Sequence, residues 1–400
     1  MNENENLVPK RRFKEFKNTG TWEQRKLGEF ADISTGKLDA NAMVEDGEYD
    51  FYTSGMKKYR IDTPAFEGPA ITIAGNGATV GYMHLADGEF NAYQRTYVLQ
   101  NFQANRYFLY SEISKKLPRK IAQEARTGNI PYIVMDMLTE LTISLPVLEE
   151  EQAKIGAFFK QLDNTIALHQ RQQDNYKQLK KYMLQKIFNQ EFRFKDENGN
   201  DYPDWEEIAL KELGETFTGL SGKTKENFGK GKGKFVTYMN VFSNSTANLA
   251  MTENVEIKDG EKQNEVCYGD IFFTTSSETP DEVGMSSVWL SHESNVYLNS
   301  FCFGYRLNSE SEGKVTHQFL GVQLRADHIR KQIVFLAQGS TRFNISKAKL
   351  TEIPVYLPAI QEQQKIADFL SMLDLRIEQL SQKVELLKEQ KKGLIQQMFV

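Results

Sequence analysis

Residues 145–163 read LPVLEEEQAKIGAFFKQLD, and residues 357–374 read LPAIQEQQKIADFLSMLD. Both stretches open with Leu-Pro, continue through an acidic, glutamine-rich turn, and enter a segment whose apolar residues recur at helical spacing. A similarity of this length between two places in one chain indicates an internal duplication.

The similarity continues upstream of both stretches. WEQRKLGEFADISTGK begins at Trp22 and WEEIALKELGETFTGLSGK at Trp205, so that the two share Trp-Glu, Leu-Gly-Glu and Gly-Lys in the same order. Arg-Phe-Lys precedes each tryptophan, at residues 12–14 and 193–195. The chain is therefore two copies of one unit, in which a short basic arm is followed by a globular segment and a long helix.

Both predicted long helices carry an apolar stripe with alternating steps of four and three residues. Equivalent positions differ by 211, as 366 − 155 and 398 − 187 show. Lys180 and Lys391 interrupt the stripe at equivalent places, and His169 and Gln173 are further polar members. The apolar and aromatic members are Ile155, Phe159, Leu162, Ile166, Tyr176, Met183 and Ile187 in the first helix, and Ile366, Leu370, Leu373, Ile377, Leu380, Val384, Leu387, Leu394 and Met398 in the second.

Such spacing over more than four heptads is typical of a coiled coil, and it would leave either helix alone with an apolar face in water. We therefore predict that the two helices pair antiparallel. The alternative is that each helix packs only on its own globular segment.

The chain divides into six segments, and short β-prone runs separated by Gly, Asn and Asp turns fill both globular ones. The predicted fold class is α+β, with two tandem α/β domains separated by two long helices that pair as an antiparallel coiled coil, and a pseudo-twofold internal repeat. The segments are an arm (1–21), a first domain (22–145), a central helix (146–190), a connector (191–204), a second domain (205–357) and a C-terminal helix (358–400).

Composition narrows the class of protein. The formal net charge is −5, so any nucleic-acid binding has to come from local basic patches. The two cysteines, Cys267 and Cys302, exclude a disulfide framework and fit a reducing compartment. The N-terminus lacks the apolar core of a signal peptide, and no apolar run is long enough to span a bilayer. We expect a cytoplasmic protein with no membrane partner.

Enzymatic motifs are incomplete. Gly219 to Thr224 (GLSGKT) suggests a P-loop, but Phe217 stands where the first glycine is required. A nuclease set could be drawn only from Pro203-Asp204 with Glu256 and Lys258, and it has no counterpart in the first copy. The five histidines lack metal-ligand spacing, and no metal site is expected. A P-loop or nuclease enzyme remains an alternative to a protein without catalytic residues.

Side chains suited to DNA readout occur in both globular segments. Gln and Asn can pair with adenine, Arg with guanine, and Lys with phosphate. We expect the lysine-rich stretch 223–234 to be a flexible loop that binds phosphate, or merely a solvated loop. Two further stretches, residues 125–133 and 337–345, suit either DNA contact or a turn into a short helix. The candidates are Lys37, Lys57, Lys58, Tyr59, Arg60, Asn76, Tyr93, Gln94, Arg95, Arg126, Thr127 and Asn129 in the first copy, and Lys223, Lys225, Lys230, Lys232, Lys234, Thr274, Thr275, Ser276, Ser340, Thr341, Arg342 and Asn344 in the second.

In their order, these motifs resemble the specificity subunits of type I restriction–modification enzymes. The resemblance covers essentially the whole chain and rests on four features: the tandem Trp-Glu starts, GDIFFT at 269–274, GSTRFNI at 339–345 and the Leu-Pro entry to each helix. The framework segments match between the copies, whereas about 38–120 and 224–330 share little.

The resemblance implies a non-catalytic subunit with two target-recognition domains, each reading one half of a split site on double-stranded DNA. It also implies that the paired helices set the spacer and dock two methyltransferase subunits, and through these the restriction/translocase subunits. No cofactor is then expected on this chain, because S-adenosylmethionine, ATP and Mg would be bound by the partner subunits. A coiled-coil scaffold that binds only protein is the remaining alternative.

Overall fold

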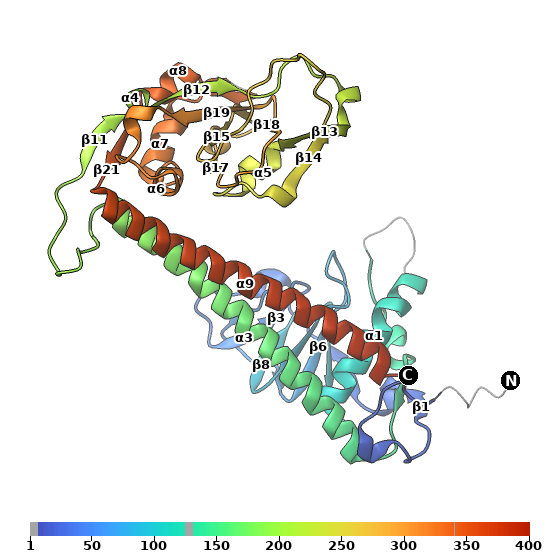
Figure 1. Cartoon of the computed structure of the whole chain (residues 1–400). Helices are drawn as coiled ribbons and strands as arrows, with labels where there is room; N and C mark the ends of the chain where they lie inside the picture. The colour runs from blue at the N-terminus through green and yellow to red at the C-terminus, as the bar shows by residue number, and fades with distance from the viewer. Residues whose placement is uncertain (1–6, 125–130, 340) are drawn as a thin grey trace. The chain divides into compact units, whose positions relative to one another are not determined.

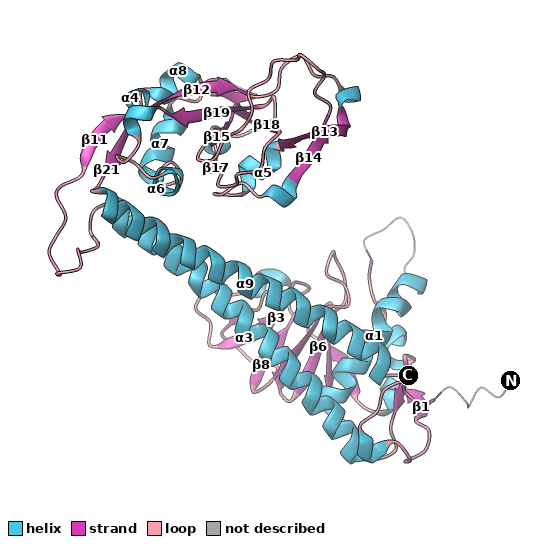
Figure 2. Cartoon of the chain, in the orientation of Figure 1, coloured by secondary structure: helices cyan, strands magenta, loops and turns pink. Residues whose placement is uncertain are grey.

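The computed structural model describes residues 7–124, 131–339 and 341–400, and Figures 1 and 2 show its helices and strands. The chain divides into two compact units, Met1–Gln172 with Leu380–Val400, and Gln173–Gln379. Each unit contains one globular part and a portion of both long helices, α3 (Glu149–Phe188) and α9 (Ile360–Met398).

The globular part of the first unit is layered. One four-stranded sheet lies between a long helix and a second sheet. Successive side chains of one strand point to opposite faces of the first sheet. Ile71 and Ile73 pack with Phe108 of the helix, whereas Ala70 packs with Phe90 of the second sheet. The first sheet has the order β2 (Asp32–Thr35), β9 (Thr96–Gln100), β6 (Ala70–Ala74), β7 (Met83–Ala86); the second has β4 (Tyr59–Ile61), β3 (Tyr49–Tyr52), β8 (Glu89–Ala92), β5 (Phe66–Glu67); β1 (Glu23–Lys26) pairs with β10 (Thr142–Leu145), and the helices are α1 (Arg106–Glu124) and α2 (Met135–Thr139).

The second unit repeats this plan. Ile271 and Phe273 face Phe319 of α6, whereas Phe272 packs with Trp289 and Val236 on the other face of the sheet. The sheets are β12 (Gly214–Thr218), β19 (Cys302–Leu307), β15 (Ile271–Thr274), β17 (Ser286–Val288); β14 (Thr252–Val255), β13 (Phe228–Val236), β18 (Val296–Leu298); β11 (Glu206–Ala209) with β21 (Pro354–Leu357); and β16 (Ser276–Ser277) with β20 (Phe343–Asn344); the helices are α4 (Leu210–Leu213), α5 (Tyr238–Ser243), α6 (His317–Gln323), α7 (Asp327–Phe335) and α8 (Lys347–Thr351).

The two sheets of each unit agree in strand order and direction, except that β5 of the first unit has no counterpart in the second. β3 and β8 pair in parallel, as do β13 and β18, and the strands flanking β9 and β19 pair antiparallel in the same order. The predicted α+β repeat is confirmed.

One detail of the predicted repeat is wrong. The motif Leu-Gly-Glu aligns Leu27 with Leu213 in the sequence, but the structural equivalent of Leu27 is Leu210. The N–H of Leu27 donates to the carbonyl of Leu141 (2.9 Å), and the N–H of Leu210 donates to that of Ile353 (3.1 Å). The two copies share a glutamate three residues after the strand rather than the glycine. Glu29 accepts a hydrogen bond from the N–H of Lys26, and Glu212 accepts one from the N–H of Ala209.

Helices α3 and α9 pair antiparallel, as the sequence predicts. In the first unit, the core contains Ile155 and Phe159 of α3 together with Met398 of α9. In the second, it contains Ile187 of α3 together with Ile366 and Leu370 of α9. Each core thus includes both helices, and the alternative in which each helix packs only on its own globular segment is excluded.

The basic arm is part of the framework. Arg12 binds both carboxylate oxygens of Glu151 at 2.6 Å, and Arg193 binds those of Glu362 at 3.2 and 2.7 Å. The side chains of Glu151 and Glu362 are fully buried. In each copy a buried ion pair therefore fixes the basic arm to the start of the long helix.

One local expectation fails in the second unit. The stretch 223–234 is not a loop throughout: it contains a 3-10 turn (Lys225–Asn227) and most of β13, in which Phe228 and Gly233 to Val236 pair with β14 and residues 229–232 form an irregularity of the register. Tyr238–Ser243 is helical, and the hydroxyl of Thr237 caps this helix by accepting from the N–H of Asn240. Among the described residues, every helix is too short or too polar to traverse a lipid bilayer.

Candidate nucleic-acid interface

Five loops of the first unit meet at one edge of its sheets, which we call loop edge 1: residues 36–39, 53–58, 75–82, 93–95 and 131–134. Four of the loops adjoin strand ends on the same side, since Thr35 pairs with Tyr97 and Ala74 with Thr96, and residues 131–134 join them through a bridge between Asn76 and Tyr132. Backbone bonds tie the loops together: the N–H of Gly75 donates to the carbonyl of Arg95 (2.8 Å), and the N–H of Ile133 to that of Gly75 (2.7 Å).

Most candidates of the first copy lie at loop edge 1. Lys37 and Arg95 are exposed, and neither makes an ion pair or side-chain hydrogen bond with a described residue. Asn76 accepts a hydrogen bond from Ser54, Gln94 donates to Asp39 (3.4 Å), and Lys57 lies over the ring of Tyr59. Tyr93 is half-buried and donates its N–H to the carbonyl of Tyr52. Arg126, Thr127 and Asn129 lie outside the described residues.

Lys58 and Arg60 are engaged within the unit. Lys58 lies 3.2 Å and Arg60 2.6 Å from the carboxylate of Asp50, and Arg60 also donates to two backbone carbonyls. Burial would raise the pKa of Asp50, but the two cations outweigh it, and the pKa lies below its ordinary value. A DNA contact by either cation would have to compete with this ion pair.

The second unit has an equivalent loop edge, loop edge 2: residues 219–221, 237–243, 275–285, 299–301 and 341–345. The same bonds recur, since the N–H of Thr275 donates to the carbonyl of Phe301 (3.0 Å) and the N–H of Ile345 to that of Thr275 (3.1 Å). Arg342 donates to the hydroxyl of Ser276 (3.2 Å), whose carbonyl accepts from Tyr238 (2.8 Å).

Two other candidates, Asn344 and Thr341, belong to this edge. Asn344 pairs with Ser276 between β20 and β16, and Thr341 is exposed beside them. Thr274 is fully buried, and its hydroxyl accepts from the N–H of Met285. This position is therefore structural. Ser340 lies outside the described residues.

The five lysines of the second copy form a separate group along β13 and its approach. Lys223 has only 4% of its side chain exposed and lies 2.5 Å from Glu261; this pairing lowers the pKa of Glu261 to about 2. Lys230 pairs with Glu256 and Lys234 with Glu293. Among the described residues, Lys225 and Lys232 make no ion pair.

Sequence reasoning missed several exposed apolar side chains at the two edges. Met56 and Tyr82 at loop edge 1, and Met239 and Phe301 at loop edge 2, are 61%, 40%, 53% and 59% exposed. No periodicity marks them, because Met56, Tyr82 and Phe301 lie outside helices and strands and Met239 lies in the short helix α5. Only the convergence of the loops brings them together.

Comparisons with known proteins match this architecture. The family model "Type I restriction modification DNA specificity domain" matches residues 19–178 and 202–389, one match for each copy. The chain belongs to this family.

Relatives agree with the family model. The Escherichia coli EcoDI specificity subunit is 36% identical over 149 residues, which are 36% of this chain and 33% of that protein. The Methanocaldococcus jannaschii MjaVIII specificity subunit is 24% identical over 94% of this chain and 91% of that protein. The crystal structure of an S subunit from M. genitalium shares the fold with a TM-score of 0.67 at 18% identity, and it covers 98% of this chain and 99% of that one.

The chain is thus a DNA specificity subunit of a type I restriction–modification system, with two target-recognition domains and no catalytic role of its own. The P-loop alternative fails on geometry as well, because Lys223 is held by Glu261 and the carbonyl of Glu256, and only a three-residue 3-10 turn follows it. In the described part of the chain, no group of three or more His, Cys, Asp or Glu could hold a metal ion.

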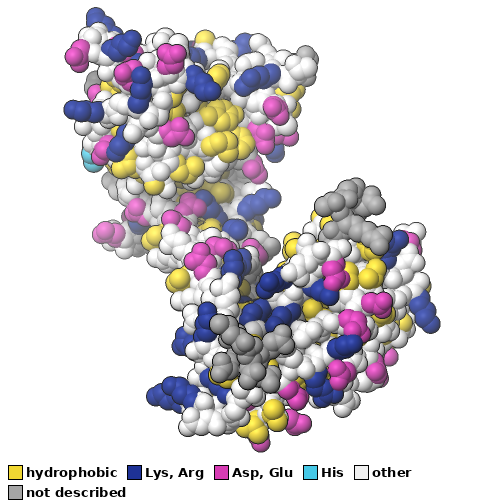
Figure 3. Space-filling model, turned by 90° about the vertical axis from the view of Figure 1, so that its right-hand side faces the viewer, with side chains coloured by type: hydrophobic (Ala, Val, Ile, Leu, Met, Phe, Trp, Pro, Cys, Tyr) yellow, Lys and Arg dark blue, Asp and Glu magenta, His cyan; other side chains and the backbone are white. Residues whose placement is uncertain are grey.

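Charge is dispersed over the face of the specificity subunit that Figure 3 shows. Figure 3 shows Lys and Arg interspersed with Asp and Glu on the visible face, without one continuous basic area. This pattern agrees with the net charge of −5 and favours DNA contacts at local sites.

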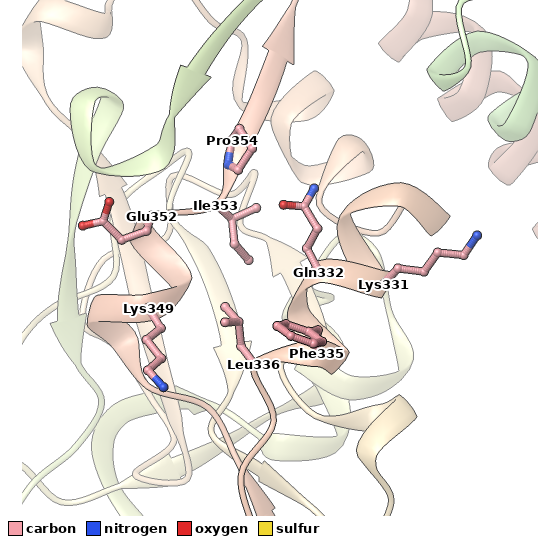
Figure 4. A pocket seen from close by; sticks show the side chains of 8 residues that line it. All are labelled: Lys331, Gln332, Phe335, Leu336, Lys349, Glu352, Ile353 and Pro354. Atoms are coloured by element: carbon pink, nitrogen blue, oxygen red, sulfur yellow. The ribbon is translucent and has the colours of Figure 1, made fainter.

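An apolar pocket of about 380 Å³ lies in the second domain, between α7, α8 and β21. Figure 4 shows Leu336 and Ile353 beside it, with Lys331 directed away. Phe335, 88% exposed, forms its rim. The pocket adjoins β21 of the framework and shares no residue with loop edge 2.

Proposed function

We propose that each loop edge reads one half of a two-part site on double-stranded DNA. The observation that carries this proposal is that the two edges share one backbone frame but differ in side chains. At equivalent places Gly75 and Asn76 correspond to Thr275 and Ser276, since Ala74 pairs with Thr96 and Thr274 with Cys302. A common scaffold with unlike reading side chains suits recognition of two different base sequences.

We further propose that α3 and α9 set the number of unread base pairs between the half-sites. A paired helix is stiff, with a rise of ~1.5 Å per residue. The apolar contacts and the two pairs Lys180–Asp374 and Lys391–Asp163 support a fixed register.

The helix pair also offers a surface for two methyltransferase subunits. Large apolar side chains are 41% to 57% exposed on this surface: Leu168 and Leu386 in the first unit, and Leu179, Tyr182 and Met372 in the second. Large exposed apolar side chains favour protein contact. Restriction/translocase subunits would join through the methyltransferases, and S-adenosylmethionine, ATP and Mg would bind to those partners in the cytoplasm.

The test is co-expression with a cognate methyltransferase, followed by genome-wide detection of methylated bases. We expect a two-part motif with a fixed gap, and two protected patches in a footprint of the complex. Exchange of residues 38–120 for those of a related chain should change one half of the motif only. A continuous motif, or a motif unchanged by the exchange, would refute the proposal and favour a scaffold that binds only protein.

A further inference from the structure

Arg95 and Phe301 occupy the same place on the shared frame. The carbonyl of Arg95 accepts from the N–H of Gly75, and that of Phe301 accepts from the N–H of Thr275. The following residues, Thr96 and Cys302, pair with Ala74 and Thr274.

The backbone hydrogen bonds of the residues just before Arg95 and Phe301 also agree between the two units. Tyr93 donates its N–H to the carbonyl of Tyr52, and Asn299 donates to that of Val236. Thr96 and Cys302 donate back to Tyr93 and Asn299, which closes the same short turn in both units. The position is therefore the tip of one turn, built twice.

Hydrogen bonds hold the backbone of this turn, and the side chain at its tip is exposed. Thr96 and Cys302, directly after the tip, are 1% and 3% exposed, whereas Phe301 is 59% exposed and Arg95 is exposed. The side-chain oxygen of Asn299 further accepts from the N–H of Phe301 (2.8 Å). Because the backbone is held by these hydrogen bonds and the side chain makes no hydrogen bond or ion pair with the described residues, binding an external group orders only the side chain and breaks no internal polar contact.

The two side chains favour different bases. A guanidinium can donate two parallel hydrogen bonds to O6 and N7 of guanine, and a phenyl ring has no donor but can contact the C5-methyl group of thymine. Loop edge 1 also carries the unpaired cation Lys37, suited to a nearby phosphate, whereas the neighbours of Phe301 are the neutral Thr275 and Asn299.

We propose that this tip is a specificity-determining position in both domains, with Arg95 contacting a guanine in one half-site and Phe301 contacting the methyl group of a thymine in the other. The inference rests on the proposed function and deepens it by assigning one base class to each half.

The experiment uses the assembled complex of this chain with its methyltransferase, and a duplex that carries the methylated motif. Each guanine is replaced in turn by 7-deazaguanine, which lacks N7, and each thymine by uracil, which lacks the methyl group. Binding is measured for the wild type, Arg95→Ala and Phe301→Ala. Arg119→Ala, exposed on α1, and Phe335→Ala serve as matched controls.

We expect one 7-deazaguanine to weaken wild-type binding roughly tenfold and one uracil to weaken it roughly fourfold, in opposite halves of the motif. Arg95→Ala should lose the response to that guanine alone, and Phe301→Ala the response to that thymine alone, while both controls keep both responses.

Unchanged responses in the two variants would overturn the inference. A half-site that lacks the assigned base would also overturn it. A third contrary outcome is a Phe301→Ala variant that binds weakly although uracil has no effect at any position, which would indicate that the phenyl ring inserts between base steps. All these outcomes leave a two-part motif in place; loss of the two-part motif in the wild type would instead refute the proposed function.

Discussion

The ammonium group of Lys391 on α9 lies 2.5 Å from the carboxylate of Asp163 on α3. Lys180 of α3 lies at the same distance from Asp374 of α9. Lys180 and Lys391 differ by the repeat length of 211 residues, and so do Asp163 and Asp374. The two ion pairs are therefore equivalent contacts of the antiparallel helix pair. The lysines that interrupt the apolar stripe thus find partners on the opposite helix.

Charge reversal at one of these pairs should weaken the helix pairing. Lys391→Asp places two carboxylates together and should lower the free energy of unfolding by about 1 kcal/mol, since the side chains are partly exposed. Adding Asp163→Lys should restore most of the loss. Urea titration of the specificity subunit in its complex measures both effects; equal losses in the single and double variants would show that the pair does not couple.

Insertion of one matched heptad into both helices should lengthen the unread spacer by about three base pairs, because seven residues rise ~10.5 Å and one base pair ~3.4 Å. The methylated motif reports the spacer length directly. A seven-residue polar insertion that breaks the stripe is the control and should prevent folding. An unchanged spacer with an intact fold would exclude the ruler role.

Removal of Arg12 from the basic arm should lower the free energy of unfolding. Arg12→Ala leaves the carboxylate of Glu151 buried without its cation, and we expect a loss of about 3 kcal/mol in unfolding free energy. Arg25→Ala, which removes an exposed pair with Glu29, is the matched control and should cost at most ~0.5 kcal/mol. Similar small effects in both variants would contradict the structural role of the arm.

Glu112 and Gln323 make hydrogen bonds to the backbone of equivalent strands, β10 in the first unit and β21 in the second. Gln323 donates to the carbonyl of Tyr356 (2.7 Å) and accepts from its N–H (3.3 Å). Glu112 accepts from the N–H of Ser144 (2.8 Å), but its second oxygen has no partner among the described residues. Burial raises the pKa of Glu112 to about 7, against the opposing effect of Lys116 at 3.7 Å and of Lys115.

Stability should therefore depend on pH through Glu112. Its pKa is higher in the folded state, so the contribution is complete below the ordinary pKa of about 4.5 and is lost as the pH rises towards 7, by up to about 3 kcal/mol. Glu112→Gln should remove this slope and stabilise the protein at pH 8, and Gln323→Glu should add a slope of the same sign. Unfolding free energies at pH 5, 6, 7 and 8 give the comparison; parallel profiles for wild type and Glu112→Gln would disprove the assignment.

The sequence by itself determined the repeat, the two long helices and their pairing. These rest on local periodicity: residues such as Ile155 and Ile366 recur at a spacing that allows one buried face, and the offset of 211 makes the two faces equivalent. The Leu-Pro turns also lie close to the helix starts, since α3 begins at Glu149, soon after Pro146, and α9 at Ile360, soon after Pro358.

Only the tertiary structure decided which candidates share a surface. Arg95 and Gly75 are distant in sequence and meet because β9 and β6 are neighbours in the sheet, and Lys223 is withdrawn from the surface by Glu261, which lies in another loop. The equivalence of Leu27 with Leu210 likewise depends on hydrogen bonds to Leu141 and Ile353. Periodicity describes the near neighbours along a chain, whereas a reading surface and a buried ion pair are made by strands and loops that only the fold brings together.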